Sequence, residues 1–364
     1  MIRFGVVGAK RATLFAEIEK HCSEQIKLCA LHDINSEALK QWKKLRPDLS
    51  LFEDYSALIS SGACDAIFIA SPIEYHAAQS IQALGAGLHV LCEIPAITTL
   101  QEASELRQAA RSARGIFALA ENYCFIEENL IIKQLCDSGT FGEISLVEGS
   151  YIHDCKDLMF SEKGDLTWRG VTNAQFQGDR YPTHAFGPIG MWLSLGLDDK
   201  LVHLTSFATK DLALKKYAQQ RFPDRFDDTF HFARGDSVHT VLQTEAGVLI
   251  NLRLDTKSNR PSAKNFHSIQ GTNGFYSSGR FDSESHVIWL VGDDGPPTKL
   301  HEHPVLASLP DLIPTNRKNV PINLRAHCLL LDEFISAVNL SGRPSFGVDA
   351  AIQWSAITPL SEAS

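Results

Sequence analysis

Tyr181 and His184 stand three residues apart in the stretch Arg180–Pro188 and carry the side chains best suited to acid–base chemistry. A phenol and an imidazole can relay a proton from a hydroxyl group near neutral pH. Pro182 restricts the backbone between them, and a Gly-Pro pair closes the stretch. The same residues could instead be a tyrosine in a loop and a histidine in the core with no catalytic role. The surrounding elements are therefore needed to distinguish a catalytic from a structural role.

Length and composition bound the kind of protein that holds this stretch. A chain of 364 residues predicts two domains, each large enough to bury its own core. Apolar residues make up 44% and charged residues 21%, as is usual for a soluble globular protein. The net charge of -9, with no block of Lys and Arg, argues against binding to nucleic acid or an anionic membrane.

The cysteines and the start of the chain indicate an intracellular setting. No CxxC pair or paired spacing occurs, so the cysteines are interpreted as reduced core residues, not disulfides or a zinc site, and no metal is expected. An apolar strand follows Met1 directly, and no apolar stretch is long enough to span a bilayer. We therefore expect a cytoplasmic protein without a signal peptide. The eight cysteines are Cys22, Cys29, Cys64, Cys92, Cys124, Cys136, Cys155 and Cys328.

The first residues have the pattern of a dinucleotide site. A strand over 2–7 leads into a turn and a helix from about Leu14, and a helix that starts there can receive a pyrophosphate. The fingerprint is degenerate, because Lys10 and Thr13 occupy the second and third glycine positions. Two of the turn's side chains are cationic, which suits a diphosphate and equally suits a solvated loop. The residues predicted to contact the cofactor here are Gly8, Ala9, Lys10 and Arg11.

Asp33 ends a second predicted strand, over 26–33, and lies 25 residues after Gly8. A carboxylate at this place accepts hydrogen bonds from the adenosine ribose and repels a 2′-phosphate. The cofactor is therefore predicted to be NAD rather than NADP. The alternative is that Asp33 caps the helix that follows it.

The next segments keep alternating between strand and helix, which predicts an N-terminal Rossmann-type, doubly wound parallel sheet in an α/β protein. Predicted helices cover 36–45, 55–61, 76–85 and 100–113, and predicted strands cover 66–70, 89–92 and 116–120. Ligands in such sheets sit at the carboxyl ends of strands. The residues predicted to contact NAD at these ends are Ser71, Pro72, His76, Glu93, Ile94, Pro95 and Asn122.

These motifs (Ser-Pro-x-x-x-His, Ala-Gly-x-His-Val-x-x-Glu-x-Pro and a later Glu-Asn) resemble the glucose–fructose oxidoreductase/inositol dehydrogenase/MocA superfamily. The resemblance implies a dinucleotide-binding domain, residues 1–122, and a C-terminal catalytic α/β domain with an open sheet, residues 123–364, whose last segment packs back on the first domain. The superfamily usually has a catalytic, nicotinamide-contacting lysine where this chain has Ile94. Isoleucine cannot exchange a proton, which counts against ordinary lysine-assisted alcohol oxidation.

The second half opens with a predicted helix over 127–138 and a strand over 144–151. Alternation along that strand puts Tyr151 and His153 on one face, as a site or as a structural pair. Arg169 and the Tyr181–His184 segment are predicted to lie in an irregular, ligand-facing loop before a helix over 188–195. The rest of the chain is predicted to hold a polar surface excursion over 210–234 and a helix over 324–340. Between them, strands over 237–244, 248–255 and 265–270 are predicted to form a mostly antiparallel sheet.

A closer resemblance rests on Glu-Asn-x-Cys, Gly-x-Tyr-x-His-Asp, Trp-Arg, Tyr-Pro-Thr-His-x-x-Gly-Pro, Arg-Pro and the terminal Asp-x-Ala-x-x-Trp-Ser-Ala-Ile-x-Pro-Leu-Ser-Glu. Together they resemble most closely the NAD-dependent α-N-acetylgalactosaminidase family of glycosidases, which also lacks the lysine. Three features depart from the family: Ser262 replaces a sugar-contacting tyrosine, Ala185 replaces a glycine, and the loop between His153 and Trp168 is shorter. By resemblance the active-site positions are Glu121, Tyr151, His153, Arg169, Tyr181 and His184.

The resemblance implies hydrolysis by oxidation of C3 of the sugar, deprotonation of C2 and elimination, an exception to the two-carboxylate scheme. His184 and Tyr181 would serve the C3 hydroxyl, Tyr151 and His153 the C2 proton and the leaving group. Glu121 and Arg169 would bind substrate. A plain NAD-dependent sugar or polyol dehydrogenase and a non-catalytic dinucleotide-bound sensor remain alternatives. The expected partners are a small sugar or glycoside and a second copy of the chain bound through the C-terminal sheet.

Overall fold

The computed structural model describes residues 1–260, 265–281, 283–340 and 342–364. The chain divides into two compact units, and each consists of two separate stretches of sequence. Unit 1 contains residues 1–127 and 313–356, and unit 2 contains residues 128–312 and 357–364. Ser262, one of the family departures, lies outside the described residues.

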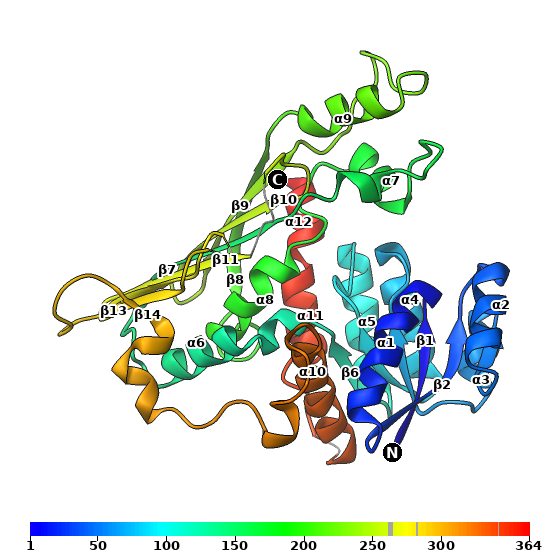
Figure 1. The fold of residues 1–364 in the computed structure, drawn as a ribbon, viewed down its shortest axis with the longest axis horizontal. Coiled ribbons are helices and arrows are strands. Elements are labelled where there is room, and N and C mark those ends of the chain that lie inside the picture. The colour runs from blue at the N-terminus through cyan, green and yellow to red at the C-terminus, as the bar shows by residue number, and fades with distance from the viewer. Residues whose placement is uncertain (261–264, 282, 341) are drawn as a thin grey trace. The chain divides into compact units, whose positions relative to one another are not determined.

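Unit 1 is built on a parallel sheet in the order β3-β2-β1-β4-β5-β6 (Figure 1). The strand order reverses between β1 and β4, which is where such sheets bind dinucleotides. The strands are β1 (Ile2–Val7), β2 (Ile26–His32), β3 (Ser50–Phe52), β4 (Ala66–Ile69), β5 (His89–Cys92) and β6 (Phe117–Leu119). The helices are α1 (Ala9–Cys22), α2 (Ser36–Leu45), α3 (Tyr55–Ser60), α4 (His76–Gly85), α5 (Leu100–Ser112), α10 (Ile322–Asn339) and α11 (Val348–Ser355).

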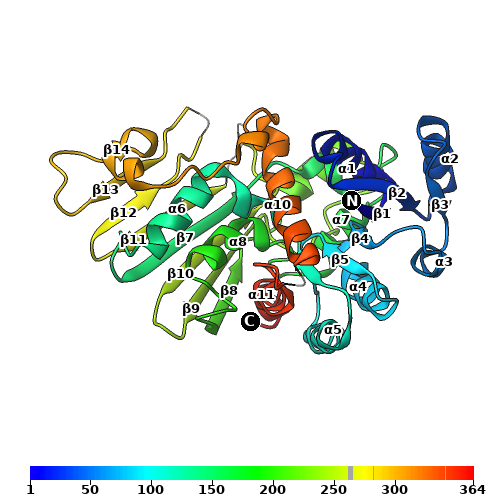
Figure 2. The same ribbon diagram turned by 90° about the horizontal axis from the view of Figure 1, so that it is seen from below.

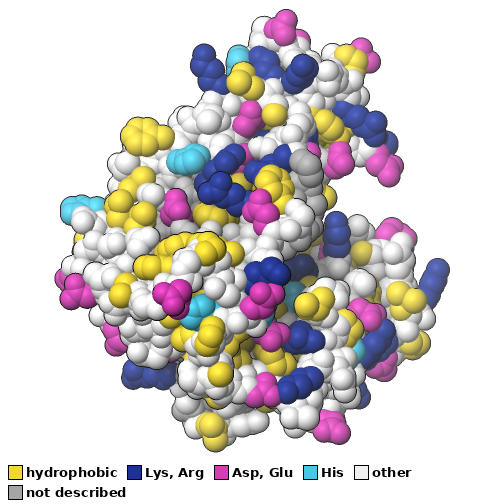
Figure 3. Space-filling view, turned by 60° about the vertical axis from the view of Figure 1, so that its left-hand side comes forward, with side chains coloured by type: hydrophobic (Ala, Val, Ile, Leu, Met, Phe, Trp, Pro, Cys, Tyr) yellow, Lys and Arg dark blue, Asp and Glu magenta, His cyan; other side chains and the backbone are white. Residues whose placement is uncertain are grey.

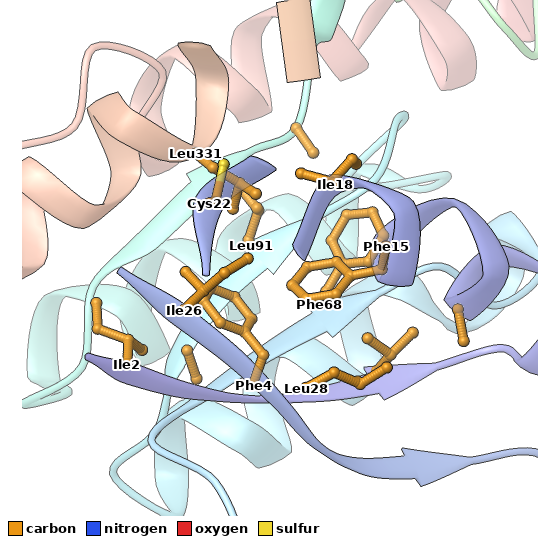
Figure 4. Packing of buried hydrophobic residues seen from close by; sticks show 14 of the residues in the cluster. Ile2, Phe4, Phe15, Ile18, Cys22, Ile26, Leu28, Phe68, Leu91 and Leu331 are labelled. Carbon is orange, nitrogen blue, oxygen red and sulfur yellow. The ribbon is translucent and has the colours of Figure 1, made fainter. Parts of the chain in front are cut away.

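The core of unit 1 joins its two stretches of sequence. The rings of Phe4 and Phe15 lie 5.1 Å apart, and Phe4 also lies 5.9 Å from Phe334 of α10. Figure 4 shows Phe4, Phe15 and Phe68 packed between β1 and α1, with Leu331 of α10 beside Cys22. Helix α10 therefore covers the apolar face of α1, which is why residues far along the chain belong to this unit.

Unit 2 is built on an eight-stranded sheet in the order β14-β13-β12-β11-β7-β10-β9-β8. Only the β7–β10 pair is parallel among these neighbours, so the sheet is mostly antiparallel, as predicted. The strands are β7 (Ile144–Ile152), β8 (Leu201–Ala208), β9 (Ser237–Thr244), β10 (Leu249–Asp255), β11 (Phe266–Gly271), β12 (Gly274–Ser277), β13 (Val287–Leu290) and β14 (Thr298–Lys299).

Helices cover one face of this sheet. In Figures 1 and 2, α6 (Glu127–Asp137) and α8 (Thr183–Trp192) lie on the same side of β7 and β10. The far end of the unit carries α7 (Trp168–Gln175) and α9 (Ala213–Arg221), and the chain ends in α12 (Ile357–Ala363). Among the described residues, no helix has the length and apolarity needed to cross a membrane.

The predicted elements differ from the observed ones where side chains decide the local structure. Helix α1 begins at Ala9, directly after Gly8, and not near Leu14. Arg169 and His184 lie in helices α7 and α8, whereas the prediction placed both in an irregular loop. The 210–234 excursion contains α9 and an apolar cluster of aromatic rings with Phe160, so it is not simply polar surface. Short strands β3, β12, β13 and β14 were not predicted.

Candidate active site

The first βα turn of unit 1 has the shape that a dinucleotide needs. Gly8 adopts φ 110°, and a Cβ there would lie 2.7 Å from the carbonyl oxygen of Ala70 at the end of β4. Only glycine fits this position without strain. Helix α1 begins at the next residue, and its N-terminus can receive a pyrophosphate, although the Ala9 N–H already donates to Asp33 and the Arg11 N–H to the Gly8 carbonyl oxygen. The turn therefore fits NAD despite the missing second and third glycines.

Asp33 is placed to complete this turn. One carboxylate oxygen accepts a hydrogen bond from the Ala9 N–H at 2.7 Å, and the other accepts from the Asn35 N–H at 2.8 Å. Asn35 itself caps α2 by accepting from Glu37 and Ala38, so the helix cap does not require Asp33. A carboxylate oxygen has lone pairs left for a ribose hydroxyl. The cap alternative is therefore wrong, because Asn35 and not Asp33 is the N-cap of α2. Asp33 instead accepts a hydrogen bond from the first residue of α1.

Arg11 has a specific partner in the same unit. Its Nε and a carboxylate oxygen of Glu93, at the end of β5, form a salt bridge. Glu93 is 18% exposed and Arg11 is 41% exposed. The pair offsets the charge of Arg11, while Lys10 is exposed in the first turn of α1. This arrangement leaves less positive charge for a 2′-phosphate than the sequence suggested.

His76 fastens two of the predicted cofactor loops to each other. Its Nδ1 lies 2.8 Å from the Pro95 carbonyl oxygen and its Nε2 lies 2.9 Å from the Ser71 carbonyl oxygen. Burial opposes a charge on the ring, but Cys92 and the two carbonyl oxygens outweigh it and raise the pKa of His76 to about 9. A protonated ring can donate to both oxygens. His76 therefore holds the Ser71–Pro72 turn and the Pro95 loop in place.

The loop around Ile94 is also held by the far end of the chain. Ile94 is buried, so an apolar side chain fills the place of the family lysine. The N–H of Ala96 donates to the Ser355 hydroxyl at 2.9 Å. Glu121 is fully buried at the end of β6 and accepts from the Tyr123 N–H at 3.0 Å, while Asn122 begins the short helix that follows.

Four aromatic side chains come together in unit 2. The Tyr151 ring lies 5.3 Å from His184, 5.8 Å from Tyr181 and 6.1 Å from His153. Tyr181 meets His184 edge-on at 5.2 Å. We call Tyr151, His153, Tyr181 and His184 the four-ring cluster. Residues that lie far apart in the chain thus bring two phenols and two imidazoles together. These side chains are the kind of acid–base groups that can transfer protons at two neighbouring carbons.

Gly149 allows α8 to approach the strand that carries Tyr151. A Cβ on Gly149 would lie 2.7 Å from the Ala185 carbonyl oxygen and 2.8 Å from the Ile189 side chain. Because side chains alternate along β7, Gly149 and Tyr151 face the same helix. The glycine of the Gly-x-Tyr-x-His motif therefore brings His184 within reach of Tyr151.

The backbone of α8 shows how His184 is oriented. Pro188 lies inside the helix and has no N–H to donate to the carbonyl of His184, four residues earlier. Asn265 supplies the missing hydrogen bond through Nδ2 at 2.9 Å. His267 on β11 donates from Nε2 to the next carbonyl, that of Ala185, at 2.8 Å. Burial lowers the pKa of His267 to about 4, so this ring stays neutral.

The segment before α8 is tied to the end of the chain. The N–H groups of Gln177 and Gly178 donate to the two carboxylate oxygens of Glu362, at 3.0 and 2.7 Å. The N–H of Asp179 donates to the Ser361 hydroxyl at 2.8 Å, and its carboxylate accepts from the Tyr181 N–H at 3.0 Å. The terminal Ser-Glu pair therefore fixes the loop that presents Tyr181.

Asp179 is an acid in an apolar setting. It is 1% exposed, and burial raises its pKa to about 6 although Tyr181 and Arg234 favour the charged form. Burial likewise lowers the pKa of Arg234 to about 10. The two charges lie in the same buried region, which makes the loop before α8 sensitive to pH.

Arg169 is the remaining substrate candidate in unit 2. It is the second residue of α7, and its guanidinium lies over the Trp168 ring at 4.2 Å from the ring centre. Next to His153, the carboxylate of Asp154 is engaged by Lys156 at 2.6 Å. Across the part of the chain that the structure describes, no three His, Cys, Asp or Glu side chains are grouped to hold a metal. The described cysteines are all free thiols.

Several residues that shape the site were not predicted. Asn265, His267, Ser361 and Glu362 act through the backbone, and nothing in their own types announces this role. One signal was present: a proline four residues after His184 leaves that carbonyl in need of a donor. The sequence did not reveal which residue would supply it.

The fold and these two sets of residues define an NAD-dependent enzyme: a Rossmann domain with a fitted dinucleotide turn, joined to a sheet domain that carries acid–base side chains. Family models agree with both halves. Residues 2–121 match the oxidoreductase family with an NAD-binding Rossmann fold, and residues 125–294 match the C-terminal domain of glycosyl hydrolase 109. The first part of the chain thus matches the oxidoreductase family with an NAD-binding Rossmann fold, and the second part matches the C-terminal domain of glycosyl hydrolase 109, which confirms the resemblance and NAD as the cofactor.

Curated relatives are family 109 proteins. One from Saccharopolyspora erythraea is 31% identical over 227 residues, which are 62% of this chain and 49% of that protein. One from Stenotrophomonas maltophilia is 28% identical over 336 residues, 85% of this chain and 72% of that protein. One from a Shewanella strain is 27% identical over 289 residues, 76% and 62% respectively. The chain spans about half the length of the first of these relatives.

Solved structures share the fold at low identity. A levoglucosan dehydrogenase in complex with NADH and L-sorbose has a TM-score of 0.77 at 15% identity, covering 100% of this chain and 97% of that one. An NAD-binding oxidoreductase from Klebsiella pneumoniae has a TM-score of 0.76 at 16% identity, covering 100% of this chain and 96% of that one. The WlbA dehydrogenase from Bordetella pertussis, in complex with NADH and UDP-GlcNAcA, has a TM-score of 0.69 at 16% identity, covering 98% of this chain and 94% of that one.

Proposed function

We propose that the protein hydrolyses a glycoside, of the N-acetylgalactosaminide type, by transient oxidation of the sugar with NAD. The observation that carries the proposal is the four-ring cluster, since it gathers two imidazoles and two phenols in a chain that also has an NAD-binding domain. Oxidative elimination needs two proton-transfer groups and no carboxylate pair. The family 109 match of the domain that holds the cluster supports the same reaction.

Each role is assigned from position and chemistry. Bound NAD would supply reversible hydride acceptance, which turns the C3 hydroxyl of the sugar into a ketone and back. His184, with Tyr181 against its edge, takes the proton of the C3 hydroxyl. Tyr151 and His153 serve the C2 proton, which a neighbouring ketone makes acidic, and the group that leaves C1. Water then adds at C1, a proton returns to C2, and reduction of the C3 ketone gives the free sugar.

Charge and hydrogen bonding complete the assignment. Arg169 is a cation whose guanidinium lies over the Trp168 ring, and it would bind sugar hydroxyls or stabilise developing charge. Glu121 is assigned to the substrate as an acceptor for a sugar hydroxyl. Residues 1–122 would hold the dinucleotide, and residues 123–364 together with Glu121 would hold the substrate. The proposed cofactor contacts are Gly8, Ala9, Lys10, Arg11, Asp33, Ser71, Pro72, His76, Glu93, Ile94, Pro95 and Asn122.

Ile94 separates this chain from the dehydrogenases of the superfamily that use the lysine. The side chain is buried and cannot accept a proton, so alcohol oxidation would have to proceed without the superfamily lysine. The four-ring cluster supplies bases at a different position in the chain. A plain dehydrogenase needs one base, whereas the cluster has two phenols and two imidazoles, and this second pair of proton-transfer groups favours the glycosidase.

A panel of p-nitrophenyl glycosides, incubated with and without added NAD⁺, tests the proposal. We expect nitrophenol release from an N-acetylgalactosaminide that depends on catalytic NAD⁺, without accumulation of NADH. Stoichiometric NADH with intact free sugar would establish the dehydrogenase instead. NAD binding with neither product would identify a sensor.

We also propose that the chain self-associates through the uncovered face of the unit 2 sheet. Helices cover the opposite face, and the uncovered face presents Phe207, Val241 and Leu249, which are 71%, 37% and 40% exposed. Phe207 pairs with His239 in the sheet register, so it points to the same side as that residue. Light scattering of the purified protein should give more than one chain per particle, and Phe207→Asp should lower that mass; a monomeric parent protein would contradict it.

A further inference from the structure

A cavity lies on the face of the unit 2 sheet opposite the four-ring cluster. Along β7, Gly149 and Tyr151 face α8, while Glu148 and Ser150 alternate to the opposite side and line a cavity of about 630 Å³. This volume is within the range of about 300–1,000 Å³ typical of small-molecule sites. The cavity is therefore separated from the four-ring cluster by the thickness of the sheet.

Three arginines line this cavity. Arg253 is paired with the buried carboxylate of Asp255 at 2.8 Å. The guanidinium groups of Arg260 and Arg280 are not paired in this way: within the described residues, neither forms an ion pair with a carboxylate. Figure 3, which brings the left-hand side of Figure 1 forward, shows Lys and Arg side chains gathered beside histidine and hydrophobic side chains.

Two aromatic rings hold the arginines that lack a carboxylate. Arg260 stacks over Phe281 at 4.9 Å, and Arg280 stacks over Phe266 at 5.1 Å. A guanidinium that lies over an aromatic ring still has N–H groups to donate, and two of them match two oxygens of a phosphate or carboxylate. Such stacking also reduces the freedom that each side chain loses when a ligand binds.

The other polar groups of the cavity do not cancel this charge. Glu148 is the acidic lining residue, and one of its carboxylate oxygens accepts from the Ser268 hydroxyl at 2.6 Å. Burial, followed by the charge of Arg253, lowers the pKa of His239, so that ring is neutral near pH 7. The three lining arginines and one lining acid leave an excess of positive charge.

We propose that this cavity binds the oxyanion of a small ligand, a phosphate or a carboxylate group, between Arg260 and Arg280. The site would be a second ligand site, independent of the glycosidase proposal and on the opposite side of the sheet from the four-ring cluster. Self-association proposed above uses the same face, so a bound oxyanion would lie at or beside the contact between copies.

Isothermal titration calorimetry of the full chain tests the site, with inorganic phosphate and succinate as separate probes and sodium chloride to match ionic strength. We expect saturable binding of at least one probe; phosphate alone would indicate a phosphorylated ligand and succinate alone a carboxylic acid. Arg260→Gln and Arg280→Gln should each weaken binding by at least about tenfold, because a charged hydrogen-bond donor is lost. The control is Arg221→Gln, which changes an exposed arginine of α9 and should bind like the parent.

Melting temperatures of the three variants show whether each is folded, and light scattering follows their mass in parallel. The proposal is overturned if neither probe gives saturable heat, or if folded Arg260→Gln and Arg280→Gln proteins bind as tightly as Arg221→Gln. It is equally overturned if these changes alter only the particle mass, since the cavity would then belong to the contact between copies. Neither outcome bears on glycoside hydrolysis, which is measured separately.

Discussion

The two units position their functional groups by different means. In unit 1, the dinucleotide turn follows from the regular strand–turn–helix geometry: Gly8 accepts a left-handed φ, and Asp33 at the end of the next strand binds the start of α1. In unit 2, side chains from distant segments hold the backbone that carries the chemistry, as Asn265 does for His184. A site set by backbone geometry is local in sequence, whereas a site set by side-chain contacts is not.

The terminal motif supports both arrangements. Ser355 receives the Ala96 N–H within unit 1, and Glu362 receives the Gln177 and Gly178 N–H groups within unit 2. The long match over 349–362 thus combines supports for a cofactor loop and for a catalytic loop, one in each unit. This division leads to predictions that separate effects on cofactor from effects on turnover.

The largest expected effect is that of His184→Ala on turnover. General-base catalysis contributes roughly 100- to 10,000-fold, so most of the rate should be lost. Affinity for NAD should hardly change, because the dinucleotide turn lies in the other unit. Steady-state rates, NAD titrations and melting temperatures measure the three quantities. Tyr181→Phe should cost less if the phenol only orients the imidazole. A folded, fully active His184→Ala protein would remove His184 from the mechanism.

Asp33→Asn should act on the cofactor alone. Replacing a charged acceptor by a neutral one costs about 1–1.5 kcal/mol, or roughly tenfold in NAD affinity. The preference for NAD over NADP should shrink further, because repulsion of a 2′-phosphate is removed. Titration with both cofactors measures this. Asp54→Asn is the matched control, since Asp54 caps α3 and asparagine caps equally well. An unchanged ratio of the affinity for NAD to the affinity for NADP would contradict the role of Asp33.

Asn265→Ala should disturb the start of α8. It leaves the buried His184 carbonyl without its donor, which costs about 1–3 kcal/mol of stability and lowers turnover with little change in NAD affinity. Pro188→Ala offers a sharp control, because the N–H it introduces can donate to that same carbonyl. The loss caused by Asn265→Ala should therefore be smaller in the Pro188→Ala background. Urea unfolding measures the free energy of unfolding of each variant. If Asn265→Ala lowers it equally with Pro188 and with Ala at position 188, Asn265 acts in another way.

Asp179 predicts the smallest and most specific effect, a dependence of stability on pH. Burial raises its pKa to about 6 in the folded protein, above the unfolded value, so the folded state holds a proton that the unfolded state loses. The contribution to stability is fully present below about pH 4 and is lost as pH rises through about 6, with a slope of at most about 1.4 kcal/mol per pH unit. Asp179→Asn should flatten this part of the stability profile; a profile parallel to the parent protein would refute the assignment.

The sequence predicted unit 1 more completely than unit 2. Regular alternation located most helices and strands of the Rossmann sheet within a few residues, because each element forms from its own stretch. The composition of the four-ring cluster followed from the resemblance, but its supports did not. Asn265, His267 and Glu362 are ordinary polar residues until folding places them beside a backbone group. Helix α7 was missed, and α8 was predicted to start at 188 and not at Thr183, because the glycines and polar residues before Pro188 resemble a loop.

The central claim is that the four-ring cluster removes a proton from C2 of a sugar oxidised at C3. The most direct measurement uses a p-nitrophenyl N-acetylgalactosaminide deuterated at C2, with catalytic NAD⁺. The account predicts slower nitrophenol release than from the undeuterated compound, or a sugar product that has exchanged its C2 deuterium with water, in either case without net NADH. Release at an unchanged rate with the deuterium fully retained would contradict it.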